Sequence, residues 1–437
     1  MIKNSFYIET YGCASNKADS YIISTVLKDV NYVQVPLNDA EFIIINTCGV
    51  KQQTENKIKR RLRNLYERYK KNINKHLIIT GCLPHIAEGY IKVIERIVPN
   101  YGAIIDLNSI QDIPKILNEV RSGHHNLIIK SIDLLDKSQF KIDYPPGKTT
   151  GIIPISEGCL GACTYCCVKN ARGRLNCYNP LSIIDNVKSQ LNQGIKQIYL
   201  TSQDCSTYEY NDINLADLIK NIVILKEKFY LRVGMINPEF LVKELDQLIT
   251  IFNFDKVYKL FHMPLQSGSD GILKKMNRTY RINPVIESLR ILKEEIPNLS
   301  FSTDIICGFP GETETDFNDT IQLIKKIKPQ ILNISKFTPR PGTKAKQMAQ
   351  INGKVIKERS MRLSHIFRES LTDANVEWEG WEGEVLVLHP GDKPHQAFGR
   401  NIAYKNVFIE NYHEKFGKFV EVEIEKVNGF NLFGFII

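Results

Sequence analysis

Apolar strand-like runs alternate with amphipathic helix-like segments through the middle of this 437-residue chain. The strand-like runs are 197–200, 230–233, 301–306 and 331–334, and the helix-like segments are 183–192, 284–295 and 314–327. Repeated βα units of this number predict a barrel or partial barrel whose working face lies at the carboxyl ends of the strands. A chain of this length also exceeds what one hydrophobic core supports, so several domains are expected.

Different patterns precede and follow these units. The runs 42–45 and 77–79 flank a basic helix-like stretch over 53–71, which predicts an N-terminal α/β domain with buried parallel strands. A proline-glycine cluster at 144–148 marks a boundary. After a basic helix over 355–374, short runs at 384–388, 407–409, 419–424 and 432–435 predict a small all-β barrel. The predicted organisation is an α/β parallel-sheet domain over 1–130, a linker over 131–148, a βα core over 149–375 and a β-barrel domain over 376–437.

The chain has ten cysteines but no secretory pattern, because Glu9 stands where a signal peptide would continue its apolar core. No uninterrupted apolar stretch reaches about eighteen residues, so we expect no membrane anchor. A reducing, cytoplasmic location follows, in which cysteines serve metal binding or catalysis rather than disulfides.

Cys159, Cys163 and Cys166, hereafter the triplet, form a Cys-x3-Cys-x2-Cys run directly after the strand-like residues 152–155. Three thiolates on one loop can hold three irons of a [4Fe-4S] cluster and leave the fourth iron open. An open iron can bind S-adenosylmethionine and deliver an electron to its sulfonium, which releases a deoxyadenosyl radical. The alternative is a zinc site completed by a distant ligand, because Cys-x2-Cys is also a zinc spacing.

Cys13, Cys48 and Cys82, hereafter the triad, are dispersed in the sequence, but each follows a strand-like run or its first turn. In a parallel sheet such loops open on the same edge, so the three sulfurs can converge on a second cluster. Three unrelated buried thiols are the alternative. No ligand role is predicted for the remaining cysteines, which lack a matching spacing: Cys167, Cys177, Cys205 and Cys307.

Three segments, 11–20 around Cys13, 46–55 around Cys48 and 167–175 after the triplet, carry a resemblance to a known family. Together with the order of the predicted domains, they resemble the radical S-adenosylmethionine methylthiotransferases over essentially the whole chain. The segments look like the archaeal and eukaryotic branch, which acts on threonylcarbamoyladenosine beside the tRNA anticodon. The resemblance implies an N-terminal methylthiotransferase domain, a radical core and a C-terminal RNA-associated TRAM barrel.

The resemblance also implies cofactor contacts at the strand ends of the core. Hydroxyl and amide groups there can fix the ribose and methionine parts of S-adenosylmethionine, and glycine lets the backbone approach closely, although such turns can also be purely structural. Arg340 can pair with a carboxylate or phosphate, or can simply be solvated. The expected contacts are Thr201, Ser202, Gln203, Asn237, Gln266, Ser267, Gly308 and Arg340.

The formal net charge of +9 is unevenly distributed. Residues 51–75 hold ten Lys or Arg against two Glu, residues 340–368 hold eight against one, and residues 376–437 hold six against ten acidic residues. An RNA-binding barrel is expected to be basic, so we hypothesise that the two basic segments, with Lys169, Arg172 and Arg174, supply most of the electrostatic contact with tRNA. A solvated helix face is the alternative.

The implied enzyme is a transferase with two [4Fe-4S] clusters and S-adenosylmethionine. One S-adenosylmethionine methylates sulfur held at the triad, and a second is cleaved at the triplet to give the radical that removes hydrogen from C2 of adenine. The partners implied are the tRNA anticodon stem-loop and an electron donor of reductase, ferredoxin or flavodoxin type. The alternatives are the same chemistry on isopentenyladenosine or on a ribosomal-protein side chain, and a non-catalytic iron–sulfur carrier or RNA-binding protein.

Overall fold

The computed structural model describes residues 3–429 and 431–437, and only the backbone of residues 371–374. The chain divides into two compact units: the first comprises residues 1–144, 152–186 and 338–346, and the second comprises 145–151, 187–337 and 347–437. Within the described ranges, no helix has the length and apolar character needed to cross a membrane.

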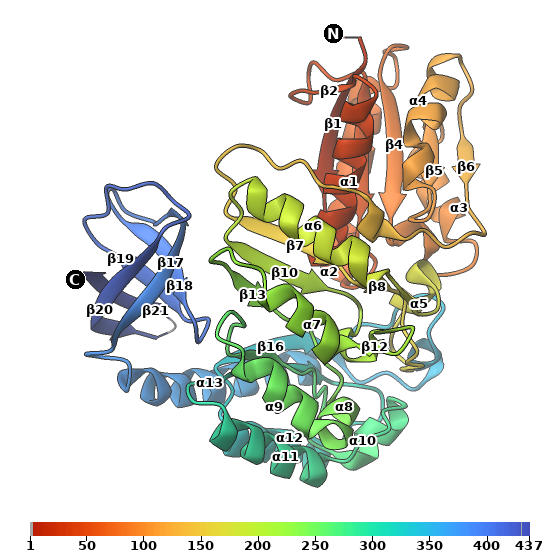
Figure 1. The fold of residues 1–437 in the computed structure, drawn as a ribbon. Coiled ribbons are helices and arrows are strands. Elements are labelled where there is room, and N and C mark those ends of the chain that lie inside the picture. Colours follow the sequence, from red (N-terminus) through yellow and green to blue (C-terminus); the bar gives the residue numbers. More distant parts are fainter. Residues whose placement is uncertain (1–2, 430) are drawn as a thin grey trace. The chain divides into compact units, whose positions relative to one another are not determined.

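The first unit is built on a six-stranded, all-parallel sheet of order β2-β1-β3-β4-β5-β6 (Figure 1). Its central strands are continuous apolar runs because helices cover both faces. The strands are β1 (Ser5–Thr10), β2 (Val33–Gln34), β3 (Phe42–Thr47), β4 (His76–Gly81), β5 (Ala103–Ile105) and β6 (Leu127–Ile129).

The helices α2 (Gln52–Tyr69) and α3 (Tyr90–Glu95) bury their apolar side chains in one core cluster with β3, β4 and β5. The helices α1 (Ala14–Asp29) and α4 (Ile113–Arg121) pack together in front of the sheet in the view of Figure 1. The strand order reverses direction between β1 and β3, and ligands of open α/β sheets bind outside the carboxyl ends of the strands at such a point. Cys13 and Cys48 follow these two strands.

The rest of the first unit carries the triplet. It contains most of β7 (Thr150–Pro154), a short antiparallel ribbon of β8 (Ser156–Glu157) and β9 (Asn176–Cys177), the helix α5 (Val168–Arg172) and the first part of α6 (Pro180–Asn192). The triplet lies on the loop between β8 and α5.

The second unit contains five further parallel strands of the βα core: β10 (Gln197–Thr201), β13 (Tyr230–Arg232), β14 (Leu260–His262), β15 (Ser300–Cys307) and β16 (Ile331–Lys336). A single parallel bridge between Leu231 and Val257 lies between the β10–β13 pair and the β14–β16 sheet, as expected for a partial barrel. The accompanying helices are α7 (Leu215–Val223), α8 (Pro238–Lys243), α9 (Leu245–Asn253), α10 (Asp270–Lys275), α11 (Ile282–Glu295), α12 (Glu314–Ile327) and α13 (Gly353–Val376).

The C-terminal residues of the second unit form a closed five-stranded barrel of order β17-β18-β19-β21-β20. The strands are β17 (Glu382–Pro390), β18 (Ala397–Asn401), β19 (Asn406–Ile409), β20 (Phe419–Asn428) and β21 (Asn431–Ile436). The predicted fold class, an α/β sheet domain, a partial βα barrel and a small β-barrel, is therefore confirmed. The strand β18 is one that the sequence pattern missed.

Candidate cluster-binding and cofactor sites

The triad converges at the carboxyl edge of the first sheet. Cys13 follows β1, Cys48 follows β3 and Cys82 follows β4, where its N–H donates to the Thr47 carbonyl at 2.8 Å. The Cys13 and Cys48 loops approach so closely that a Cβ added to Gly12 would lie 2.9 Å from the Cys48 Cβ. Gly12 has φ +118°, so both its conformation and its surroundings require glycine.

Burial opposes deprotonation of two triad cysteines, Cys48 and Cys82. Cys48 and Cys82 are 6% and 3% exposed, whereas Cys13 is exposed. Burial raises the pKa of Cys48, and it raises the pKa of Cys82 to about 12. Since iron binds thiolate, cluster assembly must displace protons that burial otherwise retains, and metal binding at this edge is therefore coupled to deprotonation.

The triplet lies on a more open loop. Cys159 and Cys163 are half-buried and Cys166 is exposed. The Gly161 N–H donates to the Cys159 Sγ at 3.2 Å, and a Cβ added to Gly161 would lie 3.3 Å from the Cys159 Sγ and 3.9 Å from the Cys163 Sγ. The loop therefore turns at Gly161 with two sulfurs close to that residue.

The donor sets of the triad and the triplet fit iron–sulfur clusters. All ten cysteines lie in the described ranges, and none forms a disulfide. Among the described residues, no three Cys, His, Asp or Glu side chains approach closely enough to share a single metal ion. A [4Fe-4S] cluster requires a wider spacing, because each thiolate binds a different iron.

A buried network of four charges lies beside the triad. The Arg172 guanidinium, from α5, contacts Asp19 at 2.7 Å and Glu157 at 2.6 Å, and the Lys137 ammonium contacts the same two carboxylates at 2.8 Å and 2.7 Å. Each of the four residues is at most 7% exposed. Burial alone would raise the pKa of Asp19, but the two cations outweigh burial and hold that pKa below its usual value.

The hypothesis that Arg172 contacts RNA phosphates is wrong, because its guanidinium is enclosed by these carboxylates. Lys169 is half-buried, and its ammonium donates to the Leu160 and Gly161 carbonyls of the triplet loop at 3.2 Å and 2.9 Å. Arg174 is exposed. The sequence pattern identified none of the partners in this network, since Lys137, Asp19 and Glu157 lie far apart in the chain.

Arg340 does pair with a carboxylate, but that carboxylate belongs to this chain. Its guanidinium contacts Glu55 of α2 at 2.7 Å and donates to the Gly49 carbonyl at 2.7 Å and to Gln52 at 2.8 Å. Arg340 is 4% exposed. It thus fixes the turn that follows Cys48, and its contact with S-adenosylmethionine stays a prediction.

The other expected cofactor residues all lie in the second unit, at the carboxyl ends of its core strands. Thr201 ends β10, Asn237 caps α8 by accepting from the Glu239 N–H at 3.2 Å, and Gly308 directly follows β15. The remaining four are Ser202 and Gln203, directly after β10, and Gln266 and Ser267, after β14. Gln266 has φ +68°, a strained conformation for a residue with a side chain, which is common at ligand sites.

One polar pair on the neighbouring strands β14 and β15 was not predicted. His262 ends β14, and its Nε2 lies 2.7 Å from the Asp304 Oδ2 of β15. Both side chains are partly exposed. Two single residues in different strands carry no recognisable spacing, so only the strand pairing reveals them.

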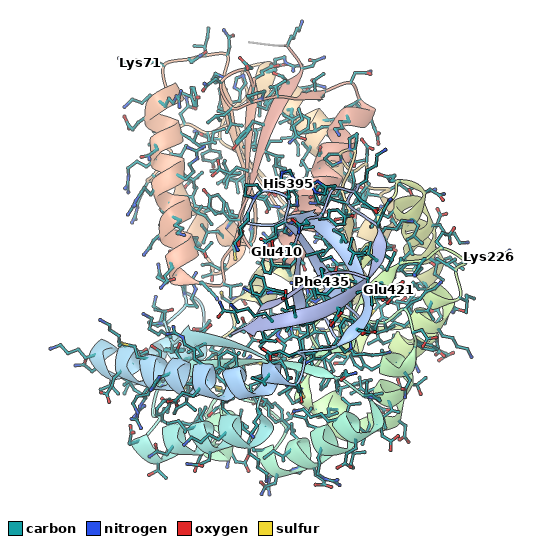
Figure 2. The ribbon with its side chains drawn as sticks, turned by 90° about the vertical axis from the view of Figure 1, so that its left-hand side faces the viewer. Lys71, Lys226, His395, Glu410, Glu421 and Phe435 are labelled. Carbon is teal, nitrogen blue, oxygen red and sulfur yellow. The ribbon has the colours of Figure 1, made fainter. Side chains whose placement is uncertain are left out.

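The basic helix α2 presents a stripe of cations to solvent. Lys57, Arg60 and Arg63 are exposed at helical spacing, and Lys71 is exposed two residues beyond the end of the helix, where Figure 2 labels it. Lys59 does not belong to this stripe, because it pairs with Glu55 at 2.5 Å. In the second basic segment Arg359 is also buried and pairs with Glu312 at 2.7 Å.

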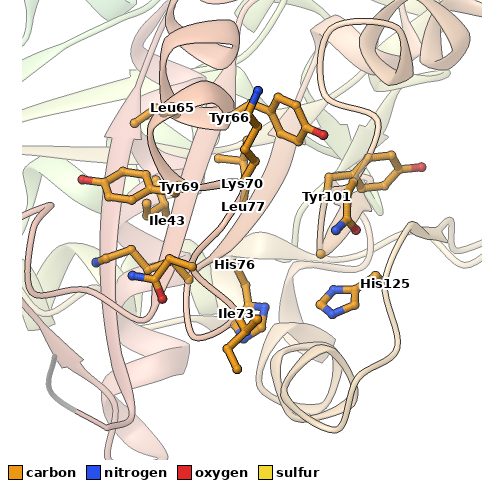
Figure 3. Close-up of a pocket in the computed structure, with 14 residues that line it drawn as sticks. Ile43, Leu65, Tyr66, Tyr69, Lys70, Ile73, His76, Leu77, Tyr101 and His125 are labelled. Atoms are coloured by element: carbon orange, nitrogen blue, oxygen red, sulfur yellow. The ribbon is translucent and has the colours of Figure 1, made fainter.

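A cavity of about 140 Å³ lies at the opposite, amino end of the strands of the first sheet (Figure 3). Among its walls are Tyr66, Tyr69, Tyr101 and the stacked rings of His76 and His125, whose centroids are 5.5 Å apart. The lining contains no cysteine and none of the residues predicted to bind a cluster or S-adenosylmethionine. The cavity therefore does not belong to the cluster sites.

Three family models match the chain: the radical SAM superfamily over residues 153–324, the uncharacterized protein family UPF0004 over residues 5–100, and the TRAM domain over residues 378–437. A solved structure of the radical S-adenosylmethionine methyltransferase TsrM from Kitasatospora setae, with cobalamin and a [4Fe-4S] cluster bound, has a TM-score of 0.56 and 13% identity. It covers 77% of this chain and 75% of that chain, and the likeness shows the fold alone.

Two curated relatives are similar over nearly the whole of this chain. A probable threonylcarbamoyladenosine tRNA methylthiotransferase of Pyrococcus horikoshii is 38% identical and covers 99% of both chains. The threonylcarbamoyladenosine tRNA methylthiotransferase of Homo sapiens is 32% identical, over 96% of this chain and 71% of that protein. The chain therefore belongs to the family of threonylcarbamoyladenosine tRNA methylthiotransferases.

Proposed function

We propose that this chain transfers a methylthio group to C2 of N6-threonylcarbamoyladenosine at position 37 of tRNA, giving 2-methylthio-N6-threonylcarbamoyladenosine. The observation that carries the proposal is the placement of two cluster-type cysteine sets, the triad and the triplet, in one compact unit of a chain with relatives of that name. The radical SAM match favours iron over zinc at the triplet. The names of the relatives favour this adenosine over isopentenyladenosine or a protein side chain.

The cysteine inventory suits the chemistry of the target. The C2–H bond of adenine has no acidic proton and no leaving group, so a radical is a sensible route for substitution. When bound, the two clusters supply the electron that cleaves S-adenosylmethionine and a holding place for the sulfur that is transferred. The chain contributes an open loop for the triplet and a more buried edge for the triad, which suits two separate tasks.

The remaining partners belong to the same proposal. Thr201, Ser202, Gln203, Asn237, Gln266, Ser267, Gly308 and Arg340 contact S-adenosylmethionine, and the stripe on α2 contacts phosphates of the anticodon stem-loop. The target base leaves the loop stack, which costs less in an unpaired loop than in a duplex. A reductase, ferredoxin or flavodoxin supplies electrons, and the enzyme works in the cytoplasm. The predicted domain limits at 130, 148 and 375 stay part of the proposal.

Nucleoside mass spectrometry tests the reaction and the substrate together. The gene is expressed anaerobically in a host that lacks its own methylthiotransferases, and digested tRNA is compared with that of the same host without the gene. We expect a methylthio increment on threonylcarbamoyladenosine. An increment on another adenosine would keep the chemistry and reject the substrate, whereas unchanged tRNA nucleosides would point to a protein substrate or a non-catalytic role.

Single cysteine variants test the division of tasks. Cys163→Ala should abolish formation of deoxyadenosine, because it removes a ligand of the open-iron cluster. Cys48→Ala should retain deoxyadenosine formation and lose sulfur insertion. Both products are measured in one anaerobic assay with S-adenosylmethionine and tRNA. Equal loss of both activities in each variant would contradict separate tasks for the two clusters.

A further inference from the structure

The four-charge network beside the triad joins chain segments that precede and follow the triplet in the sequence. Asp19 lies on α1, six residues after Cys13, and Glu157 lies on β8, two residues before Cys159. Arg172 comes from α5, after the triplet, and Lys137 from the chain between the sheet and β7. The network therefore ties the loop of the triplet to the helix that follows the first triad cysteine.

The two cations of this network are nearly equivalent toward the carboxylates. Each bridges Asp19 and Glu157, and each uses the opposite oxygen of both groups, at distances between 2.6 and 2.8 Å. The side chains of Lys137 and Arg172 are 1% and 3% exposed. Lys137 and Arg172 therefore make equivalent ion pairs with Asp19 and Glu157, and each can serve as a control for the other.

Toward the triad the two cations differ. The Arg172 Nη2 also donates to the Asn16 Oδ1 at 3.3 Å, and the same oxygen accepts from the Cys13 Sγ at 3.4 Å. Asn16 is 1% exposed and donates to the Thr47 carbonyl, next to Cys48, at 2.9 Å. The Arg172 side chain also interacts with the Cys82 thiol. Of the two cations, Arg172 is thus the one that contacts the residues around the triad sulfurs.

We propose that Arg172 is a positioning residue for the cluster bound by the triad: its guanidinium, fixed by two buried carboxylates, orients the Asn16–Cys13 turn and places a positive charge beside the cluster. The inference rests on the proposed function, because it presumes a cluster at the triad. It goes beyond that function by naming what sets the electrostatics of this cluster.

A cation beside a cluster stabilises its reduced form, because reduction adds negative charge. In other metal sites, residues that contact the metal ligands likewise change the reduction potential of the metal. Removing the guanidinium would have a second effect, since Asp19, whose negative charge also reaches Cys82, would keep only Lys137 as a counter-charge. Both effects lower the reduction potential of the cluster.

The test uses the full-length chain with Cys159, Cys163 and Cys166 changed to Ala, so that only the triad assembles a cluster. Arg172→Met and Lys137→Met are each introduced into this parent, and the cluster is titrated redox-potentiometrically with detection by electron paramagnetic resonance. We expect a lower midpoint potential for Arg172→Met and a smaller decrease for Lys137→Met, because Lys137 also neutralises Asp19 but does not contact Asn16. Both variants should lower the thermal midpoint. Equal potentials in the two variants would overturn the inference while leaving the proposed reaction intact.

A conservative pair covers the case in which the Met variants fail to fold. Arg172→Lys and Lys137→Arg keep the charge of the network, and only Arg172→Lys removes the fork that holds Asn16. Arg172→Lys should shift the midpoint potential, and Lys137→Arg should leave it at the parent value. A parent that takes up no iron would overturn the inference and the cluster assignment together, and iron analysis of the parent separates that outcome from the others.

Discussion

Cys167 lies next to a proposed cluster ligand, but its surroundings differ from those of that ligand. It adjoins Cys166, but it is 1% exposed, lies in the core cluster under α2, and donates from its Sγ to the Gly49 carbonyl at 3.3 Å. We expect Cys167→Ala to retain the iron content of two clusters after reconstitution, because it removes a small buried group rather than a ligand. Cys166→Ala is the matched control and should lose the iron of one cluster. Loss of iron from Cys167→Ala would make that residue a ligand.

The convergence of the triad and the shared loop of the triplet were predictable from the sequence, because each cysteine has a recognisable local context. A spacing such as that of the triplet is visible within a single loop, and each triad cysteine follows an apolar run. The partners of Arg172 and Arg340 were not predictable, since Asp19 and Glu55 lie more than a hundred residues away in the chain. A buried arginine and a solvated arginine look the same in a sequence, and only the tertiary structure distinguishes them.

Among the elements, α2 carries the clearest prediction for RNA binding. Arg60→Glu with Arg63→Glu should weaken tRNA binding and reduce the slope of log K against log salt by about 2, because each phosphate contact contributes roughly one unit or less. Binding is measured by filter retention between low and moderate salt. The control is Lys325→Glu with Lys326→Glu on α12, where both lysines are also exposed, so that the net charge changes equally. An unchanged slope in the α2 variant would show that these exposed arginines do not contact tRNA phosphates.

Elements with strong apolar periodicity were predicted well, and the short or polar ones were missed. The helices over 183–192, 284–295 and 314–327 correspond to α6, α11 and α12. β18 has the sequence Ala-Phe-Gly-Arg-Asn, which has no apolar run, and it is a strand because β17 and β19 pair with it on either side. β14 has only three residues, and it is a strand because it pairs with the neighbouring strand β15. Tertiary pairing therefore decides such strands.

At the scale of the whole molecule, the chain length predicted several domains, but it did not predict how the β-barrel is attached. Within the second unit, the barrel shares a core with the βα strands: Leu386, Leu388 and Tyr404 pack with Tyr230, Tyr258 and Leu260. The Tyr199 and Tyr404 hydroxyls also lie 2.5 Å apart, and the Lys259 N–H donates to the Ile402 carbonyl at 2.8 Å. No sequence pattern pairs these aromatic residues, because each reads as an ordinary strand position in its own domain.

This shared core predicts that the β-barrel is not an independent module. Removing residues 377–437 would expose Tyr230, Tyr258 and Leu260, which are 7%, 0% and 1% exposed in the full chain. Each such side chain contributes about 1.5–3 kcal/mol through burial, so the truncated chain should unfold at a lower temperature and bind more of a hydrophobic dye. Leu388→Ala in the full chain should also destabilise the protein, but less than the truncation does. We expect it to lower the free energy of unfolding by about 2–5 kcal/mol. A truncated chain with the same thermal midpoint as the full-length protein would contradict this prediction. It would show that the rest of the chain does not depend on the barrel for its stability.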